Sequence, residues 1–241
     1  TFIMIGVWGR GERKVYAAYP MAIYLSLGAM LVLAGLICVY AGAGARSFDM
    51  EELAAVYAAA PMSMGLQKWV LPLLLIGFGI LVGLFPFHSW APLAYSSAPT
   101  AAAMLHAGVL KKFGLYGIIR IILPMMPEHL RPWMEVLVVL ALCNAIYCGL
   151  IAIRQKLYSR MISYSSLSHM GFIFLGIAVL NPIALTGAVF LMVAHGFLAA
   201  LLFALNGWLY KENRSTDMTQ LSGLMQKMPF IGLIMSATMM A

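Results

Sequence analysis

Ionisable side chains interrupt several long apolar runs of this sequence, and they are its best candidates for chemistry. Placing a charge in the middle of a lipid bilayer costs about 2.5 to 3.5 kcal/mol on insertion scales, so such residues are functional candidates by default. Lysine and histidine can take up and release protons in such surroundings. The pattern predicts a proton relay inside a membrane, with six candidate members: Lys111, Lys112, His88, His106, His169 and His195.

The adjacent pair Lys111 and Lys112 cannot point in one direction, because neighbouring residues on a helix differ by about 100°. Two ammonium groups side by side repel each other, so at least one of them is expected to be neutral part of the time. A lysine that alternates between the two states can carry protons. The alternative is a lysine permanently paired with a carboxylate from outside this sequence, because no Asp or Glu lies inside the candidate spans away from their ends.

Two histidines lie in polar surroundings on successive apolar segments. His169 follows Ser165 and Ser166 at i−4 and i−3, and His195 shares nearly the same helical face with Asn206. Imidazole passes protons through either ring nitrogen, so both can extend a relay; the alternative is that each is an ordinary packing residue. No spacing resembles a zinc, haem or flavin site and no Gly-rich phosphate loop occurs, so we expect no metal and no cofactor.

The elements that must hold these residues are membrane helices. Of the 241 residues, 63% are hydrophobic and 10% are charged, whereas soluble domains carry roughly 25% charged residues, which excludes an ordinary soluble domain. Apolar runs above about 18 residues indicate membrane-spanning helices, and the short alternating segments of an outer-membrane barrel do not occur. The expected fold class is an all-α polytopic helix bundle with six spans: Val15–Tyr40, Trp69–Tyr95, Thr100–Leu123, Trp133–Ile153, Met161–Leu180 and Ile183–Tyr210.

The second of these spans is expected to be a broken helix. Its prolines and glycines free backbone groups in mid-membrane and predict a discontinuity around Phe85-Pro86-Phe87-His88. Such breaks are buried in protein or line a wet cavity, and in ion-coupled transporters they commonly border the ion path. Residues 1–8 and 228–241 read as parts of further helices, so we expect a bundle that is truncated at both ends.

Loop charges predict the orientation of the bundle. Cytoplasmic loops carry an excess of Lys and Arg, so the side with more cations should face the cytoplasm. The expected location of the protein is the inner membrane of a prokaryote. The cations occupy short loops rather than one stripe, which argues against a nucleic-acid partner. On the other side, acidic residues ahead of residues 54–60 predict a short surface helix. The cation-rich side carries Arg10, Arg13, Lys14, Arg154, Lys156, Arg160, Lys211, Arg214 and Lys227, and the other side carries Arg46, Lys68 and Arg131.

Five motifs together resemble the antiporter-like subunits of respiratory complex I. They follow the family's order over essentially the whole chain, and the Ser-His-Met-Gly stretch with the opening Ile5-Gly-Val-Trp-Gly9 looks like the M-type subunit. The five motifs are Phe85-Pro-Phe-His-Ser-Trp90, Ala98-Pro-Thr100, Gly108-Val-Leu-Lys-Lys-Phe-Gly-Leu-Tyr-Gly117, Ser163-Tyr-Ser-Ser-Leu-Ser-His-Met-Gly171 and Met192-Val-Ala-His-Gly196.

The resemblance implies an antiporter-like fold with inverted repeats, in which residues 1–124 end the first repeat and residues 125–241 begin the second. It implies a translocase: a non-redox subunit of NADH-quinone oxidoreductase that couples quinone reduction elsewhere in the complex to proton transfer. The partners would be the other membrane subunits and the lipid bilayer, with no direct NADH binding. The family's buried lysine falls on Lys112 and its histidines on His169 and His195, while Lys111, His106 and His88 are further candidates.

The sequence departs from this family at three places. Leu81 stands where the family usually has a Lys, which removes a carrier from the first half-channel, and His106, similar to a His of the related L-type subunit, is a candidate substitute. The other departures are Ala91-Pro-Leu-Ala-Tyr95 and Leu157-Tyr-Ser-Arg160. Two alternatives therefore stay open: a subunit of a cation/proton antiporter or membrane-bound hydrogenase, and a structural subunit that has lost transport.

Overall fold

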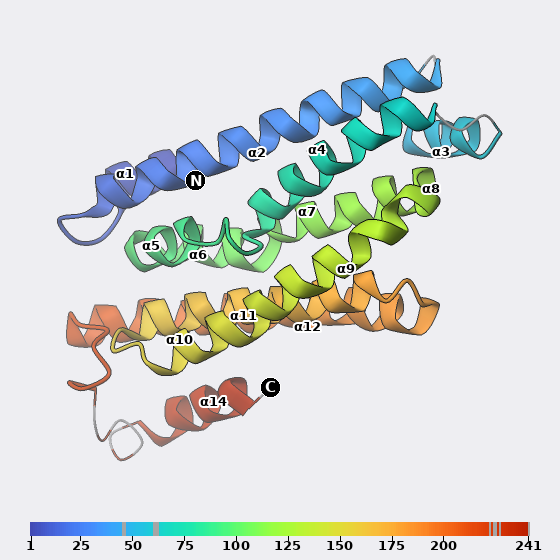
Figure 1. Ribbon diagram of the computed structural model, residues 1–241. Coiled ribbons are helices and arrows are strands. Elements are labelled where there is room, and N and C mark those ends of the chain that lie inside the picture. The colour runs from blue at the N-terminus through green and yellow to red at the C-terminus, as the bar shows by residue number, and fades with distance from the viewer. Residues whose placement is uncertain (45–46, 60–62, 222, 224–225, 227, 241) are drawn as a thin grey trace.

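Long apolar helices make up most of the chain, as its charge-free runs predict. The computed structural model describes residues 1–241 except 45–46, 60–62, 222, 224–225, 227 and 241, and Figure 1 shows the helices running side by side in a bundle. Within the described residues, five helical stretches are long and apolar enough to span a membrane. They are α2 (Lys14–Ala43), α4 (Met64–Val82), α9 (Pro127–Cys143) with its continuation η3 (Asn144–Cys148) and α10 (Gly149–Ile153), α11 (Tyr158–Ala178) and α12 (Pro182–Asn213).

The sixth expected span is a run of short helical segments that follow one another without a loop. Two of the segments are π-helical turns, whose hydrogen bonds reach five residues back instead of four and which occur frequently at functional sites. Lys111 and Lys112 directly follow the first of these turns. The segments are α6 (Thr100–Leu105), η1 (His106–Leu110), α7 (Lys112–Gly117), η2 (Ile118–Ile122) and α8 (Leu123–Met125).

The predicted break in the second span is confirmed. Helix α4 ends at Val82, and Gly83 adopts a left-handed conformation with φ of 84° that a side chain would strain. The chain then turns through residues 84–89 before α5 (Trp90–Ser97) resumes the helix. The backbone N–H groups of Gly83 and Leu84 both donate to the carbonyl oxygen of Gly79, so the end of α4 is capped by its own chain.

Three shorter helices complete the part of the chain that the structure describes. The terminal segments form α1 (Phe2–Trp8) and α14 (Pro229–Met240), as their apolar character predicts. The expected surface helix is α3 (Met50–Ala59), with Glu51 and Glu52 in its first turn, where the helix dipole favours acidic residues. Ala60, at the end of the predicted stretch, and Ala241 lie outside the described residues.

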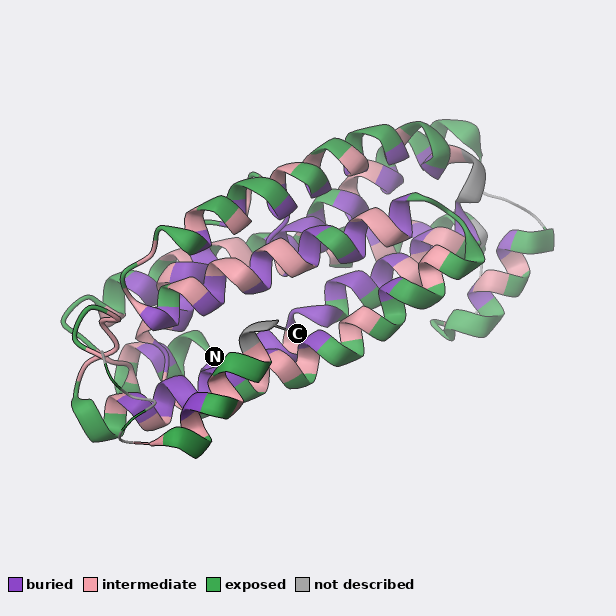
Figure 2. Cartoon of the chain, turned by 90° about the horizontal axis from the view of Figure 1, so that it is seen from below, coloured by how far each residue is buried: buried purple, intermediate pink, exposed green. Residues whose placement is uncertain are grey.

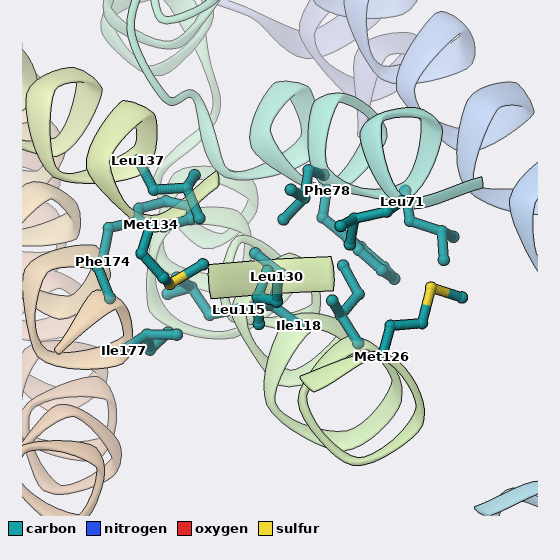
Figure 3. Close-up of a cluster of buried hydrophobic side chains, with 14 of the residues drawn as sticks. Leu71, Phe78, Leu115, Ile118, Met126, Leu130, Met134, Leu137, Phe174 and Ile177 are labelled. Carbon is teal, nitrogen blue, oxygen red and sulfur yellow. The ribbon is translucent and has the colours of Figure 1, made fainter. Parts of the chain in front are cut away.

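Apolar side chains fill the interior and also cover the outside of the bundle. Figure 3 shows the larger buried cluster, in which Phe78 of α4, Leu115 of α7, Met134 of α9 and Phe174 of α11 come together. The outer faces of α2 and α12 are exposed although they are apolar, and Phe190 of α12 is 76% exposed. Figure 2 shows exposed residues along the outside of the helices that face the viewer. An apolar exterior of this extent suits a lipid environment.

The cations are distributed unequally between the two ends of the bundle, as the sequence predicts. Eight of the nine cations of the cation-rich side belong to loops or helix ends at one end of the bundle, and Lys68 and Arg131 lie at the other end (Figure 1). Arg46 and Lys227 lie outside the described residues. The expected boundary between residues 124 and 125 falls within α8, and the assignment of the two repeats stays a prediction.

Candidate functional site

Lys112 and His195 meet inside the bundle. The Nζ atom of Lys112 lies 2.9 Å from Nδ1 of His195 and also donates to the backbone carbonyl oxygen of Ala107. Two glycines make the approach possible: a Cβ on Gly108 would lie 3.2 Å from the carbonyl oxygen of Gly196, and one on Gly196 would lie 3.0 Å from that of Gly108. Small residues at this crossing therefore bring α12 within reach of the lysine.

His169 extends this contact from α12 to α11. Its ring centroid lies 5.3 Å from that of His195, with 41° between the ring planes. Nδ1 of His169 lies 2.9 Å from the carbonyl oxygen of Ser165, and because a carbonyl oxygen only accepts, this nitrogen carries the hydrogen. In the neutral ring, Nε2 is then free to accept a proton. Lys112, His195 and His169 form a continuous series of titratable groups, which we call the relay triad.

Lys111 leaves the helix in another direction, as the 100° rotation predicts. Its side chain is fully buried, and its Nζ lies 5.4 Å from the ring centroid of Tyr95, a cation–π arrangement. Its Nζ has no hydrogen-bond partner among the residues that the structure describes. A Cβ on Gly83 would lie 3.9 Å from Cε of Lys111. Lys111 therefore lies beside the break between α4 and α5.

The two remaining candidate histidines lie near the same break. Nδ1 of His106 lies 2.9 Å from the hydroxyl oxygen of Tyr95, and the two rings are 5.5 Å apart. His88 lies within the break itself, and its ring packs edge-on against that of Tyr147, with the two centroids 5.6 Å apart. The six candidates of the sequence thus fall into two groups, the relay triad and a second group of Lys111, His106 and His88, joined through the adjacent lysines.

Two polar residues of the site were not identified from the sequence. Tyr95 links Lys111 to His106, and its position in an apolar stretch gives no signal of this role. Asn144 is fully buried, and its Nδ2 donates to the carbonyl oxygens of Gly83 at 3.3 Å and Leu167 at 3.1 Å. A signal existed for Asn144, because it is the one amide side chain in the run of residues 133–153. It ties the break to α11.

We expect Asn144→Leu to destabilise the break. The substitution leaves the carbonyl oxygens of Gly83 and Leu167 without this donor, and a buried unsatisfied polar group costs about 1–3 kcal/mol. The matched control is Asn181→Ala, which removes an exposed cap of α12 and should cost about 1 kcal/mol. Thermal inactivation of the assembled protein in membranes measures both, and equal inactivation temperatures for the two variants would contradict the assigned role of Asn144.

Lys112 also borders an open groove on the outer side of the bundle. The groove has a volume of about 480 Å³, lies between α12 and the η1–α7 segment, and is lined by apolar side chains such as Phe113, Tyr116 and Phe197 in addition to Lys112. A group from outside the described chain can therefore approach the lysine from this side. This geometry suits the expectation that any carboxylate partner of Lys112 comes from elsewhere.

Comparisons with known proteins support one family. A family model described as "NADH:quinone oxidoreductase/Mrp antiporter, TM" matches residues 1–241. The chain is 36% identical to NAD(P)H-quinone oxidoreductase chain 4 1 of Picosynechococcus sp. over 100% of this chain and 44% of the relative. It is 33% identical to NADH-quinone oxidoreductase subunit M of Rickettsia typhi, with 100% of this chain and 48% of the relative covered. The chain therefore spans less than half the length of these curated relatives.

A solved structure agrees with the sequence comparisons. The fold superposes on a chain of respiratory complex I from Thermus thermophilus with a TM-score of 0.91 and 27% sequence identity, covering 98% of this chain and 50% of that chain. The agreement extends over nearly all helices, including the broken one. The observed architecture is that of an antiporter-like subunit.

Proposed function

We propose that this chain, which belongs to the family of transmembrane subunits of NADH:quinone oxidoreductases and Mrp antiporters, carries protons across the membrane as part of an NADH-quinone oxidoreductase. Electron transfer from NADH to quinone takes place on other subunits, and we expect this chain to act without a redox cofactor of its own. Its partners are the other membrane subunits and the lipid bilayer. The cation-rich end of the bundle faces the cytoplasm of a prokaryotic cell.

The relay triad supplies the chemical steps. Protonated Lys112 donates through Nζ to Nδ1 of His195, which releases its own proton from the opposite ring nitrogen. His169 accepts at Nε2, directly or through one water molecule, because its Nδ1 is engaged with the carbonyl oxygen of Ser165. Lys112 returns to its protonated form by accepting a proton from the side of the groove. Each step moves one proton. Before the next cycle, His169 must release the added proton from Nε2 to water, and His195, left protonated at Nδ1 instead of Nε2, must return to its original tautomer.

The observation that carries this proposal is the hydrogen bond between Lys112 and His195, two titratable groups buried in the membrane-spanning bundle. His195→Gln tests it, because the amide keeps a hydrogen-bonding group of similar reach but does not titrate. In the complete complex, we expect the rate of NADH-driven proton uptake to fall about 100-fold, the lower end of the 10²- to 10⁴-fold range lost when a proton-transfer group is removed. The control is His129→Gln, outside the relay triad at the start of α9. Unchanged proton uptake in His195→Gln would refute the proposal.

A cation/proton antiporter is the second candidate, and the inclusion of Mrp antiporters in the family favours it. The two functions differ in their energy source. For the oxidoreductase subunit, we expect proton uptake by membrane vesicles to require NADH oxidation and to persist in sodium-free buffer. Sodium-driven proton movement without NADH would instead support the antiporter.

A further inference from the structure

Facing stripes of α11 and α12 continue beyond the relay triad toward the cation-rich end of the bundle. On α12, His195, Ala199, Leu202 and Asn206 follow one another at i, i+4, i+7 and i+11, so they lie on one face. On α11, the stripe from Tyr158 through Ile162 and Ser166 to His169 has a matching spacing. The helices are antiparallel neighbours, so each stripe runs about 16 Å from the histidine pair to the same end of the bundle.

Both stripes carry polar groups that are buried without partners. The hydroxyl groups of Ser166 and Tyr158 and the Oδ1 atom of Asn206 have no hydrogen-bond partner within the described part of the chain. All three residues are buried, with at most 6% of any of them exposed. Buried polar atoms are nearly always hydrogen-bonded to protein or to ordered water, so these groups call for water molecules between the two helices.

The first stretch of this route is hollow and the middle of it is apolar. A cavity of about 10 Å³, close to the minimum that holds one water molecule, is lined by Ser166, His169 and His195 and ends at Ile162 and Leu202. One helical turn further, at the level of Tyr158 and Asn206, polar groups return. Ile162 and Leu202 are both almost fully buried. These two apolar side chains separate the polar groups around the histidine pair from those of Tyr158 and Asn206 by about one helical turn.

We propose that a water-mediated path between α11 and α12 connects the relay triad with the cation-rich end, with Ser166, Asn206 and Tyr158 as its polar members and Ile162 and Leu202 as its dry constriction. This path rests on the proposed function, because it is the route by which the relay triad exchanges protons with the cation-rich side. Two backbone hydrogen bonds join the loops at the cation-rich end: Tyr158 N–H donates to the carbonyl oxygen of Thr216 at 2.9 Å, and Met218 N–H donates to that of Lys156 at 2.9 Å.

Water access to Asn206 can be tested without measuring transport. The experiment uses the complete complex with Cys38, Cys143 and Cys148 replaced by alanine and a single cysteine introduced at position 206. Silver ions are added from the cation-rich side and react with thiolates that water reaches. A cysteine that has reacted with silver is no longer labelled by a maleimide dye added after denaturation. We expect Asn206→Cys to react about 10-fold faster than Ala188→Cys, which is buried in the apolar cluster of the same helix. Lys156→Cys, exposed in a loop, marks the side of addition.

Two substitutions test the transport role of the path. Asn206→Leu and Tyr158→Phe remove polar atoms with little change in volume, and each should slow NADH-driven proton uptake several-fold while electron transfer slows less. Tyr19→Phe, on the exposed face of α2, is the matched control. Equal silver reactivity of Asn206→Cys and Ala188→Cys would overturn the path, as would normal proton uptake in both substitutions. If His195→Gln also pumped normally, the proposed function itself would fail; if only the path variants were normal, the path alone would fail.

Discussion

Replacing Lys112 by methionine should nearly abolish NADH-driven proton transport. Methionine fills a similar volume but offers no titratable group, so His195 loses the donor at 2.9 Å and the relay triad is interrupted at its first member. Loss of a proton-transfer group typically lowers a rate by 10²- to 10⁴-fold, and we expect a reduction of about 100-fold. The measurement is proton uptake by vesicles that contain the complete complex, recorded together with NADH oxidation. Proton uptake should fall more than NADH oxidation.

Lys112→Arg separates a proton carrier from a fixed positive charge. Arginine keeps the charge and the hydrogen-bonding reach but does not release its proton in proteins. A carrier therefore fails with arginine, and we expect proton uptake as low as in Lys112→Met. A lysine that only pairs with an external carboxylate keeps its role, so normal pumping in Lys112→Arg would favour the static ion pair.

The control for both variants is Lys68→Met, an exposed lysine near the start of α4. It removes one positive charge from the same chain without touching the relay triad, and proton uptake should stay normal. Full stoichiometric pumping in Lys112→Met would contradict the relay and support a structural subunit that has lost transport.

The break between α4 and α5 was predictable because its causes are local. Proline removes a backbone donor and glycine permits the left-handed turn, so Gly83 and Pro86, three residues apart, favour the end of the helix through their own backbone properties. The two directions of Lys111 and Lys112 were predictable for a similar reason, since the rotation per residue is a property of the helix alone. The π-helical turns beside them were not, because no residue type marks such a turn.

The contacts of the site depend on distant parts of the chain. The sequence indicates that His169 and His195 lie in successive spans, but their separation follows from how α11 packs on α12. The partners of Asn144 are two backbone carbonyl oxygens, one released by the break and one in α11. Backbone groups are the same in every residue, so no side-chain pattern reveals that they are neighbours.

The packing that brings these residues together leads to the second large effect, at Gly171. A Cβ at this position would lie 2.6 Å from the carbonyl oxygen of Ala141 and 2.7 Å from the backbone nitrogen of Ala145. Both obstacles are backbone atoms, which cannot turn away as a side chain can. Gly171→Ala must therefore push α11 away from α9 and η3, and overpacking of this kind costs about 1–3 kcal/mol.

Gly171→Ala should also damage transport, because the displaced helix carries His169 two residues earlier and accepts the Asn144 hydrogen bond at Leu167. We expect less assembled complex in the membrane, a lower temperature of thermal inactivation, and slower proton uptake by the complex that remains. Gly187→Ala is the matched control: it makes the same change within α12, where a Cβ meets no atom within 4 Å. If Gly171→Ala assembled and pumped as well as Gly187→Ala, the close contact of α11 with α9 would not be required, and the position of His169 would have to depend on other contacts.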